Sequence, residues 1–229
     1  MSRPLQAIVF DFDGVIANSE PLHLKAFQQA LAPEGIDLAP AEYYARYLGY
    51  DDVGLFEALA KDRGLAMSGG DVSALVVRKG EEMQQMLRSG TVLFPGAVEF
   101  IREAAAAVPI AIASGAMRHE IEEVIAAAGV SDLFVAIVAA GDTPQSKPSP
   151  APYRLALERL RDVSGREIEP RRAVAIEDSK WGLDSAQGAG LRLVGVTNSY
   201  PAHELTGAEL VVDSLTALTL PALDLLCAS

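Results

Sequence analysis

The sequence predicts an α/β fold, in which a doubly wound parallel sheet carries an inserted helical domain. Short apolar runs alternate with helical patterns over most of the 229 residues, and polar residues follow these runs. One stretch near the N-terminus breaks the alternation and is typical of helices alone. Parallel strands joined by helical crossovers form such a sheet, and its ligands bind beyond the carboxyl ends of the strands.

The predicted strands are short, continuous apolar runs, as expected for strands that are buried on both faces. Residues 7–10, 110–113, 135–138 and 173–176 fit this pattern best, and residues 193–196 and 210–212 fit it less well. Helical patterns at residues 97–107, 118–128, 151–160 and 180–189 separate the runs. Gly129 and Gly190 mark two of the helix ends.

The helical insert extends over residues 18–93, which leaves residues 1–17 and 94–229 for the sheet domain. Loop signals divide the insert at residues 33–35, 48–50, 64 and 68–70, and Pro95-Gly96 marks the return to the alternating region. A chain of this length is large enough for a main domain with a smaller insert.

The charge balance limits the class of partner. The chain has 19 Lys+Arg and 31 Asp+Glu, a formal net charge of −12, and this field repels nucleic acid. An anionic small substrate would need a metal ion or a local cation to overcome the same repulsion.

The sequence favours a reducing compartment. Cys227 is the single cysteine, so the chain forms no internal disulfide. The N-terminus lacks an apolar signal core, and no apolar run reaches the roughly 18 residues of a membrane span. We therefore expect a cytoplasmic monomer that binds neither membrane nor nucleic acid, with oligomers left open. Cys227, Trp181 and the methionines are interpreted as packing residues.

Two carboxylates follow the first predicted strand directly. Asp11 and Asp13 are separated by one residue, and Gly14 lets the chain turn sharply after them. Such a turn can place one carboxylate on the axis of a substrate and the other beside it, as a nucleophile and an acid–base group require. A surface turn that caps a helix is the alternative interpretation.

Polar residues also follow three later strands. Ser114 comes after the second strand, Lys147 lies in the loop after the third, and Glu177 and Asp178 come after the fourth. Taken singly, Ser114 and the segment Glu177-Asp178-Ser179 fit helix N-caps, and Lys147 fits a solvated loop lysine. Together with a metal ion, Lys147 would supply the local positive charge that an anionic substrate needs.

These segments form an ordered set of four motifs that resembles the haloacid dehalogenase-like hydrolase superfamily. The motifs are Asp11-Phe12-Asp13-Gly14-Val15, Ile112-Ala113-Ser114-Gly115, Lys147-Pro148-Ser149-Pro150 and Ile176-Glu177-Asp178-Ser179. The resemblance covers nearly the whole chain. It is closest to the subfamily with a helical cap after the first motif, which includes beta-phosphoglucomutases and phosphoglycolate-type phosphatases. It implies a Rossmann-like core, Mg²⁺ as cofactor and a phosphatase activity on a small phosphorylated metabolite, either a sugar phosphate or a phosphorylated organic acid.

The resemblance implies a role for each core motif. Asp11 would be the nucleophile that forms an aspartyl-phosphate, and Asp13 would be the general acid and base. Ser114 and Gly115 would bind phosphoryl oxygens, and Lys147 would neutralise phosphate charge and hold Asp11. The implied metal ligands are Asp11, Asp178 and the backbone carbonyl of Asp13, with Glu177 nearby.

The resemblance also implies substrate-binding residues outside these motifs. His23 would face the entrance of the active site, and the insert cations Arg46 and Lys79 would bind a distal anion of the substrate. Arg118, shortly after the second motif, would touch the substrate. A solvated surface position is the alternative for His23, Arg46 and Lys79.

The alternative functions are a beta-phosphoglucomutase and a non-catalytic, ligand-binding relative. In beta-phosphoglucomutases an arginine after the cap glycine binds the phosphate that is not transferred. Here Asp51 and Asp52 follow Gly49, and these carboxylates would repel a second phosphate. The sequence therefore favours water as the final acceptor.

Overall fold

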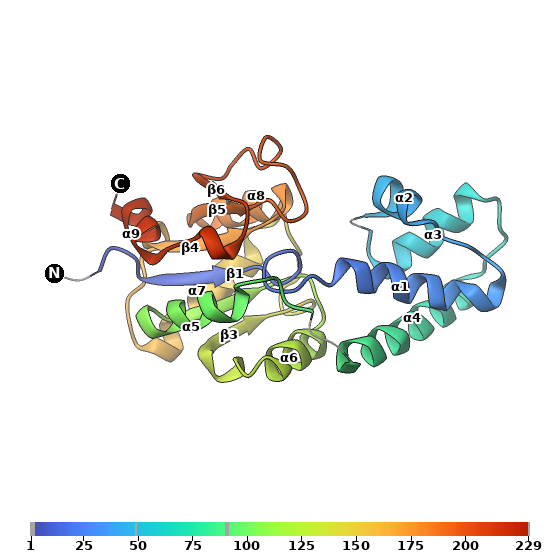
Figure 1. Ribbon diagram of the computed structural model, residues 1–229, viewed down its shortest axis with the longest axis horizontal. Helices are drawn as coiled ribbons and strands as arrows, with labels where there is room; N and C mark the ends of the chain where they lie inside the picture. The colour runs from blue at the N-terminus through green and yellow to red at the C-terminus, as the bar shows by residue number, and fades with distance from the viewer. Residues whose placement is uncertain (1–2, 49, 90–91, 229) are drawn as a thin grey trace. The chain divides into compact units, whose positions relative to one another are not determined.

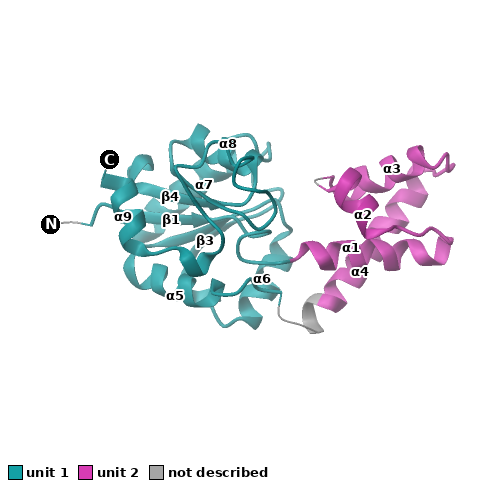
Figure 2. Cartoon of the chain, turned by 45° about the horizontal axis from the view of Figure 1, so that its top comes forward, with its two compact units in different colours: residues 1–18, 91–229 teal, residues 19–90 magenta. Residues whose placement is uncertain are grey.

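The computed structural model describes residues 3–48, 50–89 and 92–228. It divides the chain into two compact units, one formed by Met1–Asn18 with Thr91–Ser229 and the other by Ser19–Gly90 (Figure 2). The first contains the sheet, and the second is helical. We describe each unit by itself.

The sheet unit contains a six-stranded parallel sheet in the order β3-β2-β1-β4-β5-β6 (Figure 1). The strands are β1 (Ala7–Phe10), β2 (Ile110–Ala113), β3 (Phe134–Val138), β4 (Ala173–Glu177), β5 (Arg192–Val196) and β6 (Leu210–Val212). All six predicted runs form strands, and their limits differ by at most one residue from the predicted ones. The predicted α/β class with a parallel sheet is confirmed.

The order of the strands reverses at β1. The chain adds β2 and β3 on one side of β1, and then returns to add β4, β5 and β6 on the other side. Ligands of doubly wound sheets bind at such a switch point, beyond the carboxyl ends of the strands. The loops after β1, β2 and β4 therefore border the expected binding crevice.

Helices cover the sheet because side chains of a strand alternate between its two faces. Val9 packs in one buried cluster with Leu157 and Leu183, and Phe10 on the other face contacts the ring of Phe100. Burial of each such side chain stabilises the fold by about 1.5–3 kcal/mol. The helices of this unit are α5 (Ala97–Ala107), α6 (Arg118–Ala127), α7 (Ala151–Ser164), α8 (Lys180–Ala189) and α9 (Leu220–Ala228).

The helical unit has its own core, built around Phe27, Tyr43, Phe56 and Leu75. Its elements are α1 (Glu20–Leu31), α2 (Pro40–Glu42), a π-helical turn (Tyr43–Tyr47), α3 (Asp52–Asp62) and α4 (Gly69–Ser89). Helical segments end at the predicted loop signals at residues 33–35 and 64, where Gly35 and Gly64 have positive φ. The signal at residues 68–70 marks the start of α4, and the signal at 48–50 includes residue 49, which lies outside the described residues.

The two segments that lead from the sheet unit into the helical unit and back pair with each other. Asn18 N–H donates to the Val92 carbonyl over 2.6 Å, and Phe94 N–H donates to the Ile16 carbonyl over 3.0 Å. These hydrogen bonds attach residues 18 and 92–93 to the sheet unit, although the sequence prediction assigned them to the insert.

Within the described residues, no helix is long and apolar enough to span a membrane. Trp181 is 58% exposed on α8, so its interpretation as a packing residue is wrong, whereas Cys227 is buried as expected. Met117 is also exposed, because it precedes the first turn of α6 at the carboxyl edge of the sheet.

Candidate active site

The loop after β1 brings its backbone against β4. Asp11 is buried, and its N–H donates to the Ile176 carbonyl over 2.9 Å, which extends the pairing of β1 with β4 by one residue. Gly14 has a φ of +77°, and a Cβ at this position would lie 1.7 Å from Oδ2 of Asp178. Only glycine is compatible with both constraints. The glycine of the first motif therefore permits the close approach of the two acidic segments.

Lys147 joins these segments from a third loop, the one between β3 and α7. Its Nζ donates to Oδ1 of Asp11 over 2.7 Å and to Oε1 of Glu177 over 2.6 Å, and its side chain is 14% exposed. Residues that are 136 and 30 positions apart in the sequence thus share one ammonium group. The interpretation of Lys147 as a solvated loop lysine is wrong.

Glu177 is the last residue of β4 and has no exposed surface. Oε1 accepts hydrogen bonds from Lys147 and from the hydroxyl of Tyr153, and Oε2 accepts one from Ser179. A Cβ on Gly182 would lie 1.9 Å from the carboxyl group, so α8 also approaches Glu177 at a glycine. Hydrogen bonds from Lys147, Tyr153 and Ser179 therefore fix the position of the Glu177 carboxylate.

Asp178 follows β4 and is also buried. Its Oδ2 accepts a hydrogen bond from Ser199, and Asn198 donates to the Gly14 carbonyl over 2.7 Å. Ser199 and Asn198 lie just beyond β5 and were not predicted as site residues from the sequence. The signal was present, since three polar residues, Thr197, Asn198 and Ser199, follow that predicted strand directly.

The carboxylates outnumber the cation at this site. Burial and the charge of Glu177 raise the pKa of Asp11 well above its usual value, although Lys147 opposes the rise. Burial and Glu177 likewise raise the pKa of Asp178 to about 7. Burial opposes protonation of Lys147, but the charges of Asp11 and Glu177 dominate and raise its pKa. A further positive charge would relieve the repulsion among the carboxylates.

Carboxylate oxygens of Asp11, Glu177 and Asp178 lie within 4.8 Å of one another and could hold a metal ion. Mg²⁺ prefers oxygen ligands and usually retains several waters, so a few carboxylates suffice. The buried negative charge and the all-oxygen donor set both fit this ion. Asp13 is half-buried close by, since its charge contributes to the raised pKa of Asp178.

Ser114 and Gly115 lie at the end of β2. Ser114 N–H donates to the Val138 carbonyl over 2.9 Å, and Ser114 Oγ accepts from Ala116 N–H over 2.9 Å. The latter contact uses the hydroxyl as an acceptor and is compatible with donation of its proton to a ligand. Gly115 is exposed, and a Cβ there would meet nothing within 4 Å.

Arg118 lies in the sheet unit, and its guanidinium contacts protein groups. It donates to Oδ2 of Asp142 over 2.6 Å and to the Ile137 carbonyl over 3.0 Å, and it pairs with Glu122. Arg159 of α7 donates to the same two acceptors. These contacts tie the loop after β3 to α6 and α7, and they do not favour the expected contact with substrate.

The predicted residues of the helical unit form a second polar cluster. Lys79 Nζ donates to Nδ1 of His23 over 2.9 Å and to Oδ1 of Asp52 over 2.8 Å, and it lies 4.9 Å from the centroid of the Phe27 ring. Burial and Lys79 lower the pKa of His23 to about 3, so His23 is neutral near pH 7. The alternative of a solvated Lys79 is wrong, because the residue is 2% exposed.

The sequence contained a signal for the burial of Lys79. Val72, Leu75, Lys79 and Met83 are all buried and lie on one face of α4, at the spacing of an apolar helical stripe. Arg46, in contrast, is half-exposed, and it pairs with Asp62 over 2.7 Å and lies over the Tyr47 ring. The two insert cations that were predicted to bind substrate, Lys79 and Arg46, are thus already paired with carboxylates.

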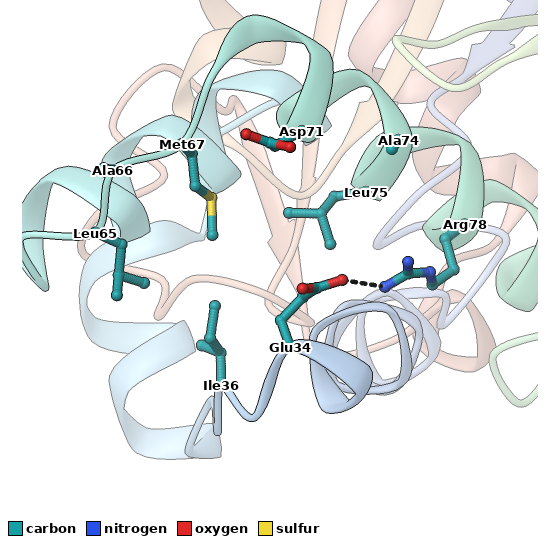
Figure 3. Close-up of a pocket in the computed structure, with 9 residues that line it drawn as sticks. All are labelled: Glu34, Ile36, Leu65, Ala66, Met67, Asp71, Ala74, Leu75 and Arg78. Carbon is teal, nitrogen blue, oxygen red and sulfur yellow. Dashed lines mark hydrogen bonds and ion pairs between the residues drawn. The ribbon is translucent and has the colours of Figure 1, made fainter.

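A pocket in the helical unit has a different character (Figure 3). Its wall is formed by Ile36, Leu65, Met67 and Leu75, with the ion pair of Glu34 and Arg78 at one side. The pocket contains none of the predicted site residues. Asp71 also lines the pocket, so its wall combines apolar and charged side chains.

Comparison with known proteins identifies the family. The family model of haloacid dehalogenase-like hydrolases matches residues 5–190. The chain belongs to this family. The protein CbbY of Cereibacter sphaeroides is 35% identical over 226 residues, which cover 93% of this chain and 94% of the relative. The phosphoglycolate phosphatase of Pectobacterium atrosepticum is 27% identical over 91% of this chain and 88% of the relative.

Solved structures agree with this assignment. The crystal structure of CbbY from Rhodobacter sphaeroides in complex with phosphate has a TM-score of 0.83 and 30% identity, and covers 96% of this chain and 99% of that chain. The beta-phosphoglucomutase of Clostridium difficile, at 22% identity, shows the same fold with a TM-score of 0.80 over 98% of this chain and 97% of that chain. The resemblance inferred from the four motifs is confirmed: the chain is a haloacid dehalogenase-like hydrolase, and its relatives include phosphatases.

Proposed function

We propose that this haloacid dehalogenase-like hydrolase is a Mg²⁺-dependent phosphatase that transfers the phosphoryl group of a small phosphate monoester to Asp11. The single observation that carries the proposal is the sharing of Lys147 between Asp11 and Glu177, beside Asp178. This arrangement combines a carboxylate nucleophile, a fixed cation and excess negative charge. Phosphoryl transfer depends mainly on such positioning and charge stabilisation.

In the first step, a carboxylate oxygen of Asp11 would attack phosphorus while the bond from phosphorus to the ester oxygen breaks. Lys147 binds Oδ1, so the carboxylate has a second oxygen for the attack. Asp13 would give its proton to the departing alkoxide. Ser114 and the N–H of Gly115 would donate hydrogen bonds to the phosphoryl oxygens, and Lys147 would neutralise part of their charge.

In the second step, a water molecule would attack phosphorus of the aspartyl-phosphate, and Asp13 would take its proton. The bond from Asp11 to phosphorus then breaks, which regenerates both carboxyl groups in their starting states. Asp11, Asp178 and the carbonyl of Asp13 would hold Mg²⁺, with Glu177 beside them. The ion would neutralise charge that develops on the transferred group.

The cations of the helical unit bear on the choice of substrate. Lys79 is paired with Asp52, and Arg46 is paired with Asp62. We propose that His23, Lys79 and Arg46 bind the part of the substrate that is not transferred, and that this part carries no second phosphate. The substrate would then be a monophosphate of a sugar or small organic acid. A CbbY variant has been crystallised with xylulose-(1,5)bisphosphate, and our proposal for this chain differs from that ligand.

The test is a screen of phosphorylated metabolites with Mg²⁺, in which free phosphate and isomerised product are measured together. We expect phosphate release from one or more monophosphates, and its loss when a chelator removes the metal. Release that is insensitive to chelator would contradict the metal-dependent mechanism. Rapid conversion of beta-glucose 1-phosphate to glucose 6-phosphate, with negligible free phosphate, would instead establish a mutase.

A further inference from the structure

Tyr153 is a buried residue that contacts both partners of the central ion pair. It lies in the first turn of α7, and its side chain is completely buried. Its hydroxyl donates to Oε1 of Glu177 over 2.6 Å, the same oxygen that accepts from Lys147 over 2.6 Å. Its ring centroid lies 5.3 Å from Nζ of Lys147. Tyr153 thus approaches Glu177 with its polar end and Lys147 with its aromatic face.

Packing alone explains the ring of Tyr153 but not its hydroxyl. Tyr153, Ala156, Leu157 and Leu160 form the buried stripe of α7, and a phenylalanine would complete this stripe equally well. A buried hydroxyl needs a partner, and here the partner is a carboxylate that is itself fully buried. Burial and the charge of Glu177 raise the pKa of Tyr153, so its hydroxyl stays protonated and acts as the donor.

The Tyr153 hydroxyl contacts one of the two carboxylates that bind the Lys147 ammonium, namely Glu177. Two carboxylates compete for the ammonium, and Glu177 is the more deeply buried one, at 0% exposed against 7% for Asp11. A hydrogen bond from Tyr153 disperses part of the charge on Oε1 and fixes this oxygen in space. Without it, Oε1 would attract Lys147 more strongly, and the glutamate could turn.

We propose that Tyr153 is a positioning residue, which holds Glu177 so that Lys147 remains bound to Asp11. The inference rests on the proposed function, since it assigns Tyr153 a role in the reaction at Asp11. Neither the motifs nor their spacing includes Tyr153, which lies three residues beyond the third motif. Its aromatic ring supports Lys147 through a cation–π contact, and its hydroxyl supplies the orientation.

The test is the variant Tyr153→Phe, which keeps the ring and removes only the hydroxyl. We expect kcat to fall about 10-fold with KM changed less than about 2-fold, because the loss concerns the orientation of the reacting groups. The matched control is Tyr47→Phe. Tyr47 is also a buried tyrosine, and its hydroxyl donates to the carboxylate of Asp62 over 3.0 Å in the helical unit. The control should lose similar stability and keep its kcat.

A double-mutant cycle separates positioning of Lys147 from a general loss of packing. In a Lys147→Met background, Tyr153→Phe should lower the residual turnover less than 2-fold, because there is no ammonium left to position. A repeated 10-fold loss in that background would overturn the proposal, as would an unchanged kcat in the single variant. If the wild-type chain released no phosphate from any monoester, the proposed function would fail first, independently of Tyr153.

Discussion

Lys147 in the sheet unit is partly buried and Lys79 in the helical unit is buried, and each ammonium donates hydrogen bonds to two side chains, but their surroundings differ in charge. Lys147 lies between two carboxylates, and Asp178 adds a third beside them. Lys79 lies between one carboxylate and a neutral histidine. The first cluster has the larger excess of negative charge. In the second, the charge of Glu20 adds to that of Asp52 near Lys79. The larger excess calls for a cation and an electrophile, whereas a lysine already neutralised by carboxylates does not favour a second phosphate.

The largest expected effect comes from removing the proposed nucleophile of the first cluster, Asp11. Asp11→Asn keeps the size of the side chain but abolishes its nucleophilic oxygen, so turnover should fall by at least about 1,000-fold. Circular dichroism and the thermal midpoint should show a folded protein. Trapping of phosphoprotein from a labelled substrate gives the direct check, since wild type should carry acid-stable label at Asp11 and the variant none. Turnover near wild type would exclude the covalent mechanism.

The second prediction concerns the carboxylates near Lys147 that exceed the positive charge there. Asp178→Ala should raise the Mg²⁺ concentration needed for half-maximal activity by roughly 100-fold, because a direct ligand is lost. Glu177→Gln should raise it less, by roughly 10-fold, since the hydrogen bonds of Glu177 are directed to Lys147, Tyr153 and Ser179. Titrations of activity with Mg²⁺ measure both values. An unchanged requirement in Asp178→Ala would remove Asp178 from the metal site.

The third prediction concerns the ion pair of Lys79 and Asp52 in the helical unit. Asp52→Asn removes the carboxylate that neutralises Lys79 while keeping its shape, so a substrate with a second phosphate should bind better. We expect KM for a sugar bisphosphate to fall about 5-fold relative to that of the corresponding monophosphate. Asp51→Asn is the matched control. Asp51 carries the same charge at the adjacent position, but it caps α3 through Gly54 N–H, and asparagine can retain that cap.

If both variants changed the ratio of the two KM values equally, the effect would come from overall charge and not from Lys79. If neither changed it, the pairing of Lys79 would not determine the preference for a monophosphate. Steady-state phosphate release with the two substrates at equal ionic strength decides between these outcomes.

Lys147 and Lys79 show which features of the fold and of the site could be predicted from the sequence. The strands, the four motifs and the fold followed from apolar runs with polar residues at their ends, because buried parallel strands leave a strong local signal. Lys147 was recognised since it belongs to a motif. The resemblance implied its contact with Asp11, 136 residues away, but its second partner, Glu177, was not predicted.

Errors and omissions arose where a polar residue lies within an apolar pattern. Lys79 and Tyr153 occupy buried stripes of α4 and α7, and a pattern of this kind shows burial but not the partner that makes burial tolerable. The substrate contact of Arg118 stays a prediction, and the sequence did not indicate that its guanidinium donates to Asp142, 24 residues later. Ion pairs between distant segments depend on the fold as a whole, so the sequence did not reveal them.

The smallest expected effect concerns that more exposed ion pair. Burial alone would raise the pKa of Asp142, but hydrogen bonds from Arg159 and from Ala139 N–H, with the charge of Arg118, lower it below 3.8. A lowered pKa in the folded state means that ionised Asp142 stabilises the fold at pH values above 3.8, and that this contribution is lost as the pH falls below it. Asp142→Asn should therefore lower the free energy of unfolding by about 1 kcal/mol at pH 7.

The two thermal midpoints should approach each other as the pH falls through the lowered pKa of Asp142, because the wild-type carboxyl group then becomes protonated and loses the same charge. At pH 7 a difference of about 2–4 °C is expected for a chain of this size. Melting curves of both proteins from pH 3 to pH 7 provide the measurement. A difference that stayed constant over this range would mean that Asp142 stabilises the loop through its shape and hydrogen bonds, and that its charge contributes little. The charge of Asp142 would then matter far less than the charges around Lys147, where loss of one carboxylate is expected to cost activity and not merely stability.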